Sequence, residues 1–205
     1  EQRPWLRPAP TQPTLPEEGS YRSSYVRCVP ALPDGERLYV SVGCNDGTSR
    51  LLVLGQAVQS IGWAPQTPCV SLLATKQGLY AWDTGLDGTV WRIQLTEERS
   101  LNELARKDMR ICDLAATPDG SLFASVRRCS GEDEAFVAAL DPLTLEERFR
   151  FGSGRFDDIN GLYVDDAELY VNDWAEPDGD EFYGRFQVFS LSGEYLREVR
   201  VDDMP

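Results

Sequence analysis

Four Leu-aromatic pairs recur at nearly regular intervals along this chain of 205 residues, and their spacing constrains the fold more than any other feature. The copies are Leu38-Tyr39, Leu79-Tyr80, Leu122-Phe123 and Leu169-Tyr170. Successive copies are separated by 41, 43 and 47 residues, and each follows a turn signal such as Pro118-Asp119-Gly120. Self-similarity at a period of this length predicts a repeat protein.

Each repeat contains several short runs rich in β-branched and aromatic residues, which are separated by Gly, Asp and Pro and read as strands. This pattern predicts an all-β fold, a β-propeller with four recognisable four-stranded blades, either complete or part of a larger ring. We expect blades at residues 25–66, 67–108, 109–153 and 154–201 within one domain that spans 21–205. An all-β sandwich is the competing architecture, whereas the scarcity of amphipathic 3.6-residue periodicity excludes a helix-rich fold.

Residues 1–20 differ in composition from the rest of the chain. They contain five prolines and no periodic apolar pattern, so we expect an extended arm or linker in polyproline conformation. Trp5 is a candidate anchor for this arm on a partner or on the domain itself. A disordered tether is the alternative.

Charge and residue usage exclude several classes of function. The chain has 20 Lys and Arg against 34 Asp and Glu, a net charge of −14, which argues against nucleic acid and anionic membrane surfaces. No apolar run approaches the roughly 20 residues of a membrane span, so a soluble acidic domain is expected. The absence of histidine excludes Ser-His-Asp and Cys-His catalysis and every His-ligated metal site.

The repeat also organises the cysteines. Ten positions before the Leu of each pair lie three cysteines and one isoleucine: Cys28, Cys69, Cys112 and Ile159. In a propeller these positions fall on the innermost strand of successive blades. Three thiolates there could hold a soft metal, but we favour cysteine as a small hydrophobic side chain packed between blades. One residue further along lie Val29, Val70, Asp113 and Asn160, of which two are polar.

Two cysteine pairs flank predicted hairpin turns and are candidate disulfides, Cys28-Cys44 and Cys112-Cys129. Neighbouring antiparallel strands bring such residues near enough to bridge where the register allows. A two-residue turn at Asp119-Gly120 would place Cys112 opposite Arg127, which leaves Cys129 two residues out of register. Cys69 has no partner in this scheme, and reduced cysteines are the alternative.

The fourth repeat contains the most specific motifs. It opens on Asn160-Gly161-Leu162-Tyr163-Val164, continues after a turn with Leu169-Tyr170-Val171-Asn172-Asp173, and later has Gln187-Val188-Phe189. In these features it resembles an NHL repeat. It is also similar to sugar-lactonase and strictosidine-synthase-like propellers, in which an Asn-Gly pair opens the innermost strand. The resemblance implies a propeller of the six-bladed type, seen here as four repeats.

The resemblance also implies a metal site. In the lactonase-like propellers the Asn of Asn-Gly and an Asp from another blade coordinate a divalent cation, here Asn160 and Asp113. Their oxygen atoms suit Ca²⁺, which takes about six to eight such ligands. This set of ligands is incomplete, because Val29 and Val70 cannot bind a cation. Only Glu17 or Glu18 could supply the third ligand. The alternative, which we favour, is that Asp113 and Asn160 cap inner strands by hydrogen bonding.

No catalytic constellation emerges from these residues, so the sequence favours a non-catalytic interaction module over an enzyme. We expect a scaffold that binds a protein partner within a larger complex, with Trp5, Trp63 and Trp174 as candidate interface anchors. The alternative function is a calcium-dependent lactone hydrolase. The candidate disulfides and a start that lacks Met favour a secreted or organelle-lumen protein, although the sequence does not distinguish this from the cytoplasm.

Overall fold

The computed structural model describes residues 26–29, 38–43, 49–54, 58–62, 70–83, 88–95, 101–126, 134–175 and 183–200. Before Ser71 the description covers the backbone alone. None of the described residues belongs to a helix of the length and apolarity needed to cross a membrane. The predicted N-terminal arm and its Trp5 lie outside the described residues.

The strands form four antiparallel sheets, each built from four strands that are consecutive in the chain. Sheet 1 contains β1 (Val26–Val29), β2 (Leu38–Gly43), β3 (Ser49–Leu54) and β4 (Val58–Gly62). Sheet 2 contains β5 (Val70–Thr75), β6 (Gly78–Asp83), β7 (Thr89–Leu95) and β8 (Leu101–Asp108). Sheet 3 contains β9 (Ile111–Ala116), β10 (Leu122–Val126), β11 (Phe136–Leu140) and β12 (Glu147–Phe151). Sheet 4 contains β13 (Asp158–Val164), β14 (Glu168–Ala175), β15 (Tyr183–Ser190) and β16 (Tyr195–Arg200).

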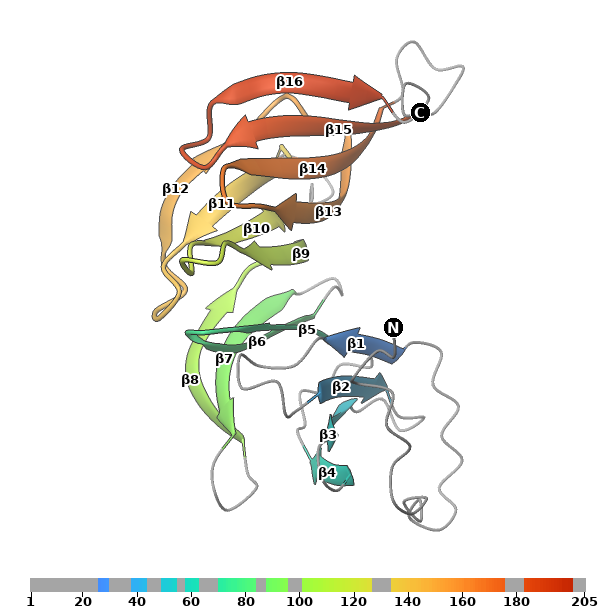
Figure 1. Ribbon diagram of the computed structural model, residues 1–205, viewed down its shortest axis with the longest axis vertical. Helices are drawn as coiled ribbons and strands as arrows, with labels where there is room; N and C mark the ends of the chain where they lie inside the picture. Colours follow the sequence, from blue (N-terminus) through green and yellow to red (C-terminus); the bar gives the residue numbers. More distant parts are fainter. Residues whose placement is uncertain are drawn as a thin grey trace, which may run out of the picture.

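This architecture confirms the predicted all-β class. The up-and-down order of four strands within every sheet is that of a propeller blade. The first strands of successive sheets contact one another, β1 with β5, β5 with β9 and β9 with β13. Sheets 1 and 4 lie at opposite ends of the molecule, so the described residues form an open stack of sheets and not a closed ring of four (Figure 1).

Two apolar cores fill the spaces between sheets 2 and 3 and between sheets 3 and 4. Successive side chains of a strand point to opposite faces of its sheet, so one strand can serve two cores. In β10, Leu122 and Ala124 belong to the core shared with sheet 2, which contains Tyr80. Phe123, between them in the sequence, belongs to the core shared with sheet 4, which contains Leu169 and Val171. In sheet 3 the Leu-aromatic pair therefore contacts both neighbouring sheets.

The turn between β9 and β10 is one residue longer than predicted. The Thr117 N–H donates to Ser121 O at 3.0 Å, and the Gly120 N–H donates to Thr117 O at 2.9 Å. The loop between these paired ends therefore has three residues, 118–120, in place of the two expected. Gly120 has a φ of 99°, in the left-handed region that favours glycine.

The longer turn changes the register of the hairpin. Asp113 pairs with Ser125, and the next pair joins Ile111 to Val126, so a β-bulge separates them. Cys112 lies at this bulge and not opposite Arg127, which corrects the register expected from a two-residue turn. A bulge of this kind bends a strand and re-aims its neighbouring side chains.

Candidate functional site

Asp113, one of the two predicted metal ligands, connects sheet 3 to sheet 4. Its Oδ2 accepts a hydrogen bond from the Leu162 N–H of β13 at 3.0 Å, and its Oδ1 accepts one from the Leu114 N–H at 2.9 Å. The Asp113 N–H in turn donates to Ser125 Oγ at 3.0 Å. Both carboxylate oxygens thus bind backbone amides, which are the contacts expected of the strand-capping alternative. The metal assignment stays a prediction.

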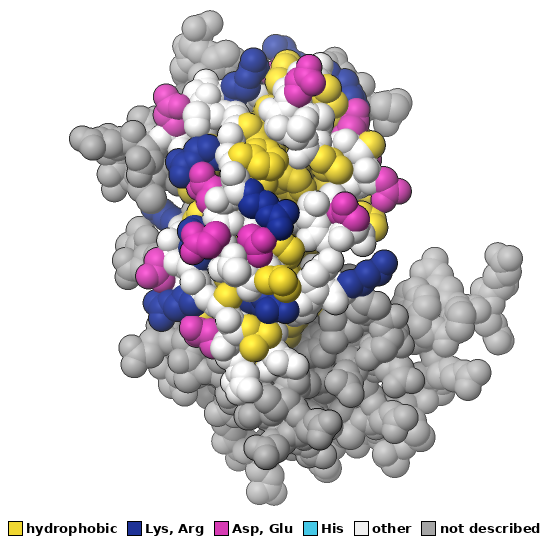
Figure 2. Space-filling model, turned by 90° about the vertical axis from the view of Figure 1, so that its left-hand side faces the viewer, with side chains coloured by type: hydrophobic (Ala, Val, Ile, Leu, Met, Phe, Trp, Pro, Cys, Tyr) yellow, Lys and Arg dark blue, Asp and Glu magenta, His cyan; other side chains and the backbone are white. Residues whose placement is uncertain are grey.

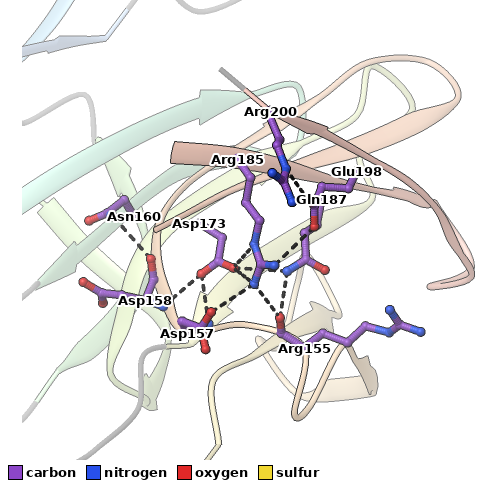
Figure 3. Close-up of polar contacts among 9 residues, drawn as sticks. All are labelled: Arg155, Asp157, Asp158, Asn160, Asp173, Arg185, Gln187, Glu198 and Arg200. Atoms are coloured by element: carbon purple, nitrogen blue, oxygen red, sulfur yellow. Dashed lines mark hydrogen bonds and ion pairs between the residues drawn. The ribbon is translucent and has the colours of Figure 1, made fainter. Parts of the chain in front are cut away.

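Asn160, the second predicted ligand, lies at a β-bulge in β13. Ile159 pairs with Asp173 and Gly161 pairs with Asn172, so Asn160 falls between two paired positions. Its side chain is exposed, and its Nδ2 donates to Asp158 O at 3.3 Å (Figure 3).

The register also changes which residues of sheets 3 and 4 correspond. Both first strands contain a bulge, at Cys112 in β9 and at Asn160 in β13. Asp113 therefore corresponds to Gly161, and the alignment of Asp113 with Asn160 by counting residues was wrong. A Cβ atom at Gly161 would lie 3.4 Å from Asp113 Oδ2, so the carboxylate closely approaches this part of β13.

The most completely buried charged group described is Asp173 on β14, whose exposed fraction is 0%. Its Oδ1 accepts hydrogen bonds from the N–H groups of Asp157 at 3.1 Å and Asp158 at 2.9 Å. Its Oδ2 accepts from Arg185 Nε at 2.9 Å, Arg185 Nη2 at 2.7 Å and Gln187 Nε2 at 3.1 Å (Figure 3). A buried carboxylate needs such partners, because leaving water without them is costly.

Arg185 extends this network across sheet 4. Its Nη2 also donates to Arg155 O at 3.0 Å and to Asp157 Oδ2 at 3.2 Å, and its Nη1 donates to Glu198 Oε2 on β16 at 3.2 Å. Burial alone would lower the pKa of Arg185, but the hydrogen bond and charge of Asp173 outweigh it and raise the pKa. The network ties β14, β15 and β16 to the segment before β13, so we interpret it as structural.

The acidic groups that the structure describes do not converge on a metal-binding arrangement. Among the described residues, no group of three or more Asp, Glu, Cys or His side chains could hold a metal ion. Glu17 and Glu18, the predicted substitutes for a third calcium ligand, lie outside the described residues.

Of the three predicted interface tryptophans, only Trp174 is described. It lies on β14 with an exposed fraction of 46%, and Tyr163 on β13 is exposed to 62%. Tyr163 pairs with Tyr170 across the two strands, and their ring centroids are 5.7 Å apart. The half-buried Tyr170 and Asn172 and the exposed Trp174 alternate along β14 with the buried Leu169, Val171 and Asp173, so these three residues share one face. Trp5 and Trp63 lie outside the described residues.

The candidate disulfides stay predictions. Cys112 is half-buried at the bulge of β9, and Cys129 lies outside the described residues. Cys28 lies in β1, where the backbone alone is described, and pairs with Val40 of β2. Cys44 and Cys69 also lie outside the described residues.

Comparison with known proteins adds little to this geometry. No family model and no curated protein matches the chain. Among solved structures, the chain is similar to an alpha-L-arabinofuranosidase from Clostridium thermocellum, with 10% sequence identity and a TM-score of 0.48. The likeness covers 87% of this chain and 72% of that one. At this identity and score it supports no argument, so the proposals below rest on the chain's own residues.

Sequence reasoning missed the network of Asp173 and Arg185. The available signal was the strand Leu169-Tyr170-Val171-Asn172-Asp173, in which strict alternation places Asp173 on the same face as Leu169 and Val171. A charge on a buried face requires an opposite charge nearby. Which of the chain's Arg and Lys residues provides it depends on the pairing of β14 with β15, where Asp173 lies opposite Arg185.

Proposed function

We propose that this protein is a non-catalytic β-sheet module that binds another protein through the outer face of sheet 4. By outer face we mean the face of β13–β16 turned away from sheet 3, which includes Tyr163, Tyr170, Asn172 and Trp174. The single observation behind the proposal is that this face carries the exposed Tyr163 and Trp174 beside a half-buried Tyr170, whose counterparts in sheets 2 and 3 are buried.

The repeat allows sheet 4 to be compared directly with sheets 2 and 3. The aromatic residue of each Leu-aromatic pair lies opposite one residue of the preceding strand: Tyr80 opposite Leu73, Phe123 opposite Ala115, and Tyr170 opposite Tyr163. Tyr80 is 0% exposed and Phe123 is 2% exposed, because each packs in a core shared with the next sheet. At the corresponding position of sheet 4, Tyr170 is half-buried and Tyr163 is largely exposed.

The composition of the outer face suits a protein partner. Tyr and Trp contribute large apolar area and a polar tip, and both are enriched at the energetic centres of interfaces. A polar contact accompanies them, since Arg197 of β16 binds both oxygens of Glu168 of β14 across β15 at 2.6 and 2.7 Å, and Tyr170 donates to Glu168 at 2.7 Å. An aromatic patch with an adjacent ion pair is the usual composition of a protein interface.

The NHL and lactonase resemblance stays a separate prediction. It implies Ca²⁺ at Asp113 and Asn160, whereas Asp113 uses both carboxylate oxygens to bind backbone amides. No contact described here favours the hydrolase over the binding module, so we advance the binding module.

The proposal is tested by affinity capture with the purified chain and two single variants. Trp174→Glu places a charge on the outer face, and Leu143→Glu places one at a residue of the β11–β12 turn that is 54% exposed. We expect proteins retained by the wild type to remain with Leu143→Glu and to be lost with Trp174→Glu, while both variants keep the wild-type melting temperature. Equal retention by all three chains would refute the proposal.

A further inference from the structure

We infer that Asn160 is a site of spontaneous covalent modification, where asparagine converts to aspartate or isoaspartate, and that this conversion loosens the contact between sheets 3 and 4. The inference goes beyond the proposed function and does not depend on the outer face of sheet 4. It rests on three observations: the residue that follows Asn160, the bulge in which Asn160 lies, and the neighbouring carboxylate of Asp113.

Asn160 has the local chemistry that this reaction requires. Its side chain is exposed, so water reaches the amide. The next residue is Gly161, which has no side chain to obstruct the approach of its own backbone nitrogen to Cγ of Asn160. Nδ2, the nitrogen that leaves, donates to Asp158 O over a rather long 3.3 Å (Figure 3). The dipeptide therefore presents an accessible amide beside an unhindered nucleophile.

The β-bulge in β13 brings the dipeptide out of the regular ladder. Ile159 pairs with Asp173 and Gly161 pairs with Asn172, so Asn160 is the extra residue between two paired positions. In a regular strand the extended backbone holds the side chain of one residue away from the nitrogen of the next. A bulge disrupts the ladder locally and bends the strand. Ring closure at Asn160 therefore needs less rearrangement than at an asparagine inside a regular strand.

The conversion needs water and no other reagent. The Gly161 nitrogen gives up its proton to solvent and bonds to Cγ of Asn160, the Cγ–Nδ2 bond breaks, and Nδ2 takes up a proton and leaves as ammonia. The product is a cyclic succinimide. Water then opens the ring at either carbonyl carbon, which yields aspartate with the original backbone or isoaspartate with one extra methylene group in the backbone. In total, one water enters and one ammonia leaves.

The other described asparagines lack this combination. Asn102 is exposed and belongs to β8, on the side of the molecule where charged side chains are interspersed with hydrophobic ones (Figure 2). However, it lies at a paired position of β7 and β8, and the side chain of Glu103 hinders attack by the next nitrogen. Asn172 is half-buried and precedes Asp173. We therefore expect Asn160 to convert fastest of the three.

The turn at Asp119-Gly120 has a glycine in the same place but is protected by hydrogen bonds. The Gly120 N–H donates to Thr117 O at 2.9 Å, so the nitrogen that would attack is engaged. The Asp119 carboxylate accepts hydrogen bonds from Thr117 Oγ1 and the Ser121 N–H, which lower its pKa and keep it ionised. An ionised carboxylate resists nucleophilic attack, because its charge repels the nucleophile. This turn is an internal control for the reaction.

The conversion acts on the contact that Asp113 makes between sheets 3 and 4. Asp113 Oδ2 accepts a hydrogen bond from the Leu162 N–H at 3.0 Å, and a Cβ atom at Gly161 would lie 3.4 Å from the same oxygen. Isoaspartate lengthens the backbone directly before Gly161, so it moves Gly161 and the Leu162 N–H relative to this carboxylate. Aspartate keeps the backbone length and only replaces the donor Nδ2 by a charged oxygen near Asp158 O. Isoaspartate should therefore weaken the contact more than aspartate does.

The experiment is incubation of the folded, purified chain at neutral pH and body temperature for several weeks. Mass spectrometry of its proteolytic peptides detects the gain of one mass unit when an amide becomes an acid, and an isoaspartyl methyltransferase assay measures isoaspartate. We expect conversion at Asn160 to be at least severalfold faster than at Asn102, with no isoaspartate at Asp119. Asn160→Gln should abolish the conversion, and Gly161→Ala should slow it severalfold.

A second measurement tests the effect on the contact between the sheets. Anion exchange separates the converted chain by its additional negative charge. The isoaspartate fraction should melt below the fresh chain, and Asn160→Asp should melt between the two. In an Asp113→Ala background the conversion should lower the melting temperature less, because both changes act on one contact. Asp113→Asn replaces Asp113→Ala if the latter does not fold.

Two results would overturn the inference. One is an Asn160 that converts no faster than Asn102 in the folded chain. The other is an isoaspartate fraction that melts at the same temperature as the fresh chain. Neither result bears on the binding proposal, which affinity capture with Trp174→Glu tests separately.

Discussion

The two faces of sheet 4 come from the same four strands, and the molecule uses them differently. One face packs on sheet 3 with Leu169, Val171 and Phe189 buried at 0–1% and with Asp173 enclosed by hydrogen bonds. The other face carries Tyr163 and Trp174, exposed at 62% and 46%. Strand alternation gives every sheet two faces, so a repeat that stacks on its predecessor always offers its successor a surface.

The largest expected effect is a difference in stability between variants of two adjacent residues that lie on opposite faces of sheet 4. Asp173→Ala removes the buried partner of the half-buried Arg185 and should lower the free energy of unfolding by about 3–5 kcal/mol. Asn172→Ala, on the outer face, should change it by roughly 0.5 kcal/mol or less in the monomer. Urea unfolding of both variants measures the difference. Similar losses for the two would mean that the faces are not energetically distinct.

A second contrast uses apolar side chains. Leu169→Ala opens a cavity in the core between sheets 3 and 4 and should cost about 2–5 kcal/mol. Tyr163→Ala truncates an exposed ring and should cost roughly 1 kcal/mol or less. A loss for Tyr163→Ala as large as that for Leu169→Ala would contradict the difference between the two faces. Thermal melts of both variants provide the test.

Loss of the Asp113 contact between sheets 3 and 4 should reduce stability by a smaller amount. The same residue also belongs to the predicted calcium site. Asp113→Ala leaves the N–H of Leu162 without its acceptor and should cost about 1–3 kcal/mol. Asn160→Ala at the exposed bulge should cost roughly 0.5 kcal/mol or less. We expect the melting temperature of the wild type to be unchanged by Ca²⁺. A rise with Ca²⁺ that disappears in Asn160→Ala would instead support the metal site and the hydrolase.

The smallest effect on stability concerns the ion pair of Glu168 and Arg197 on the outer face. The hydrogen bond from Arg197 lowers the pKa of Glu168 to about 2, below its usual value of 4.5. The pair therefore contributes stability that is complete above about pH 4.5 and is lost as the pH falls toward 2. Glu168→Gln should make stability less dependent on pH in this interval, as measured by urea unfolding at several pH values. An unchanged dependence would show that the pair contributes nothing.

Part of the candidate functional site could be predicted from the sequence, and part could not. The Leu-aromatic repeat predicted four-stranded units, and the position of Trp174 at a predicted strand edge made it a candidate anchor. Counting back from the pair failed by one residue at Asp113 and Asn160, because the turn at 118–120 is one residue longer than the corresponding turn after Val164. Loop length and bulges shift register without disturbing the hydrophobic pattern, so counting along the chain does not reveal them.

The sequence by itself determined the all-β class and the recurrence of one sheet-forming unit, because alternation of apolar residues is a local property of each strand. Only the tertiary structure decided that Phe123 is buried while the equivalent Tyr170 and its neighbour Tyr163 are partly or largely exposed. The side chains at these positions are chemically alike, and what differs is whether another sheet lies beside them. Burial is a property of neighbours in space, which the local sequence of one repeat does not encode.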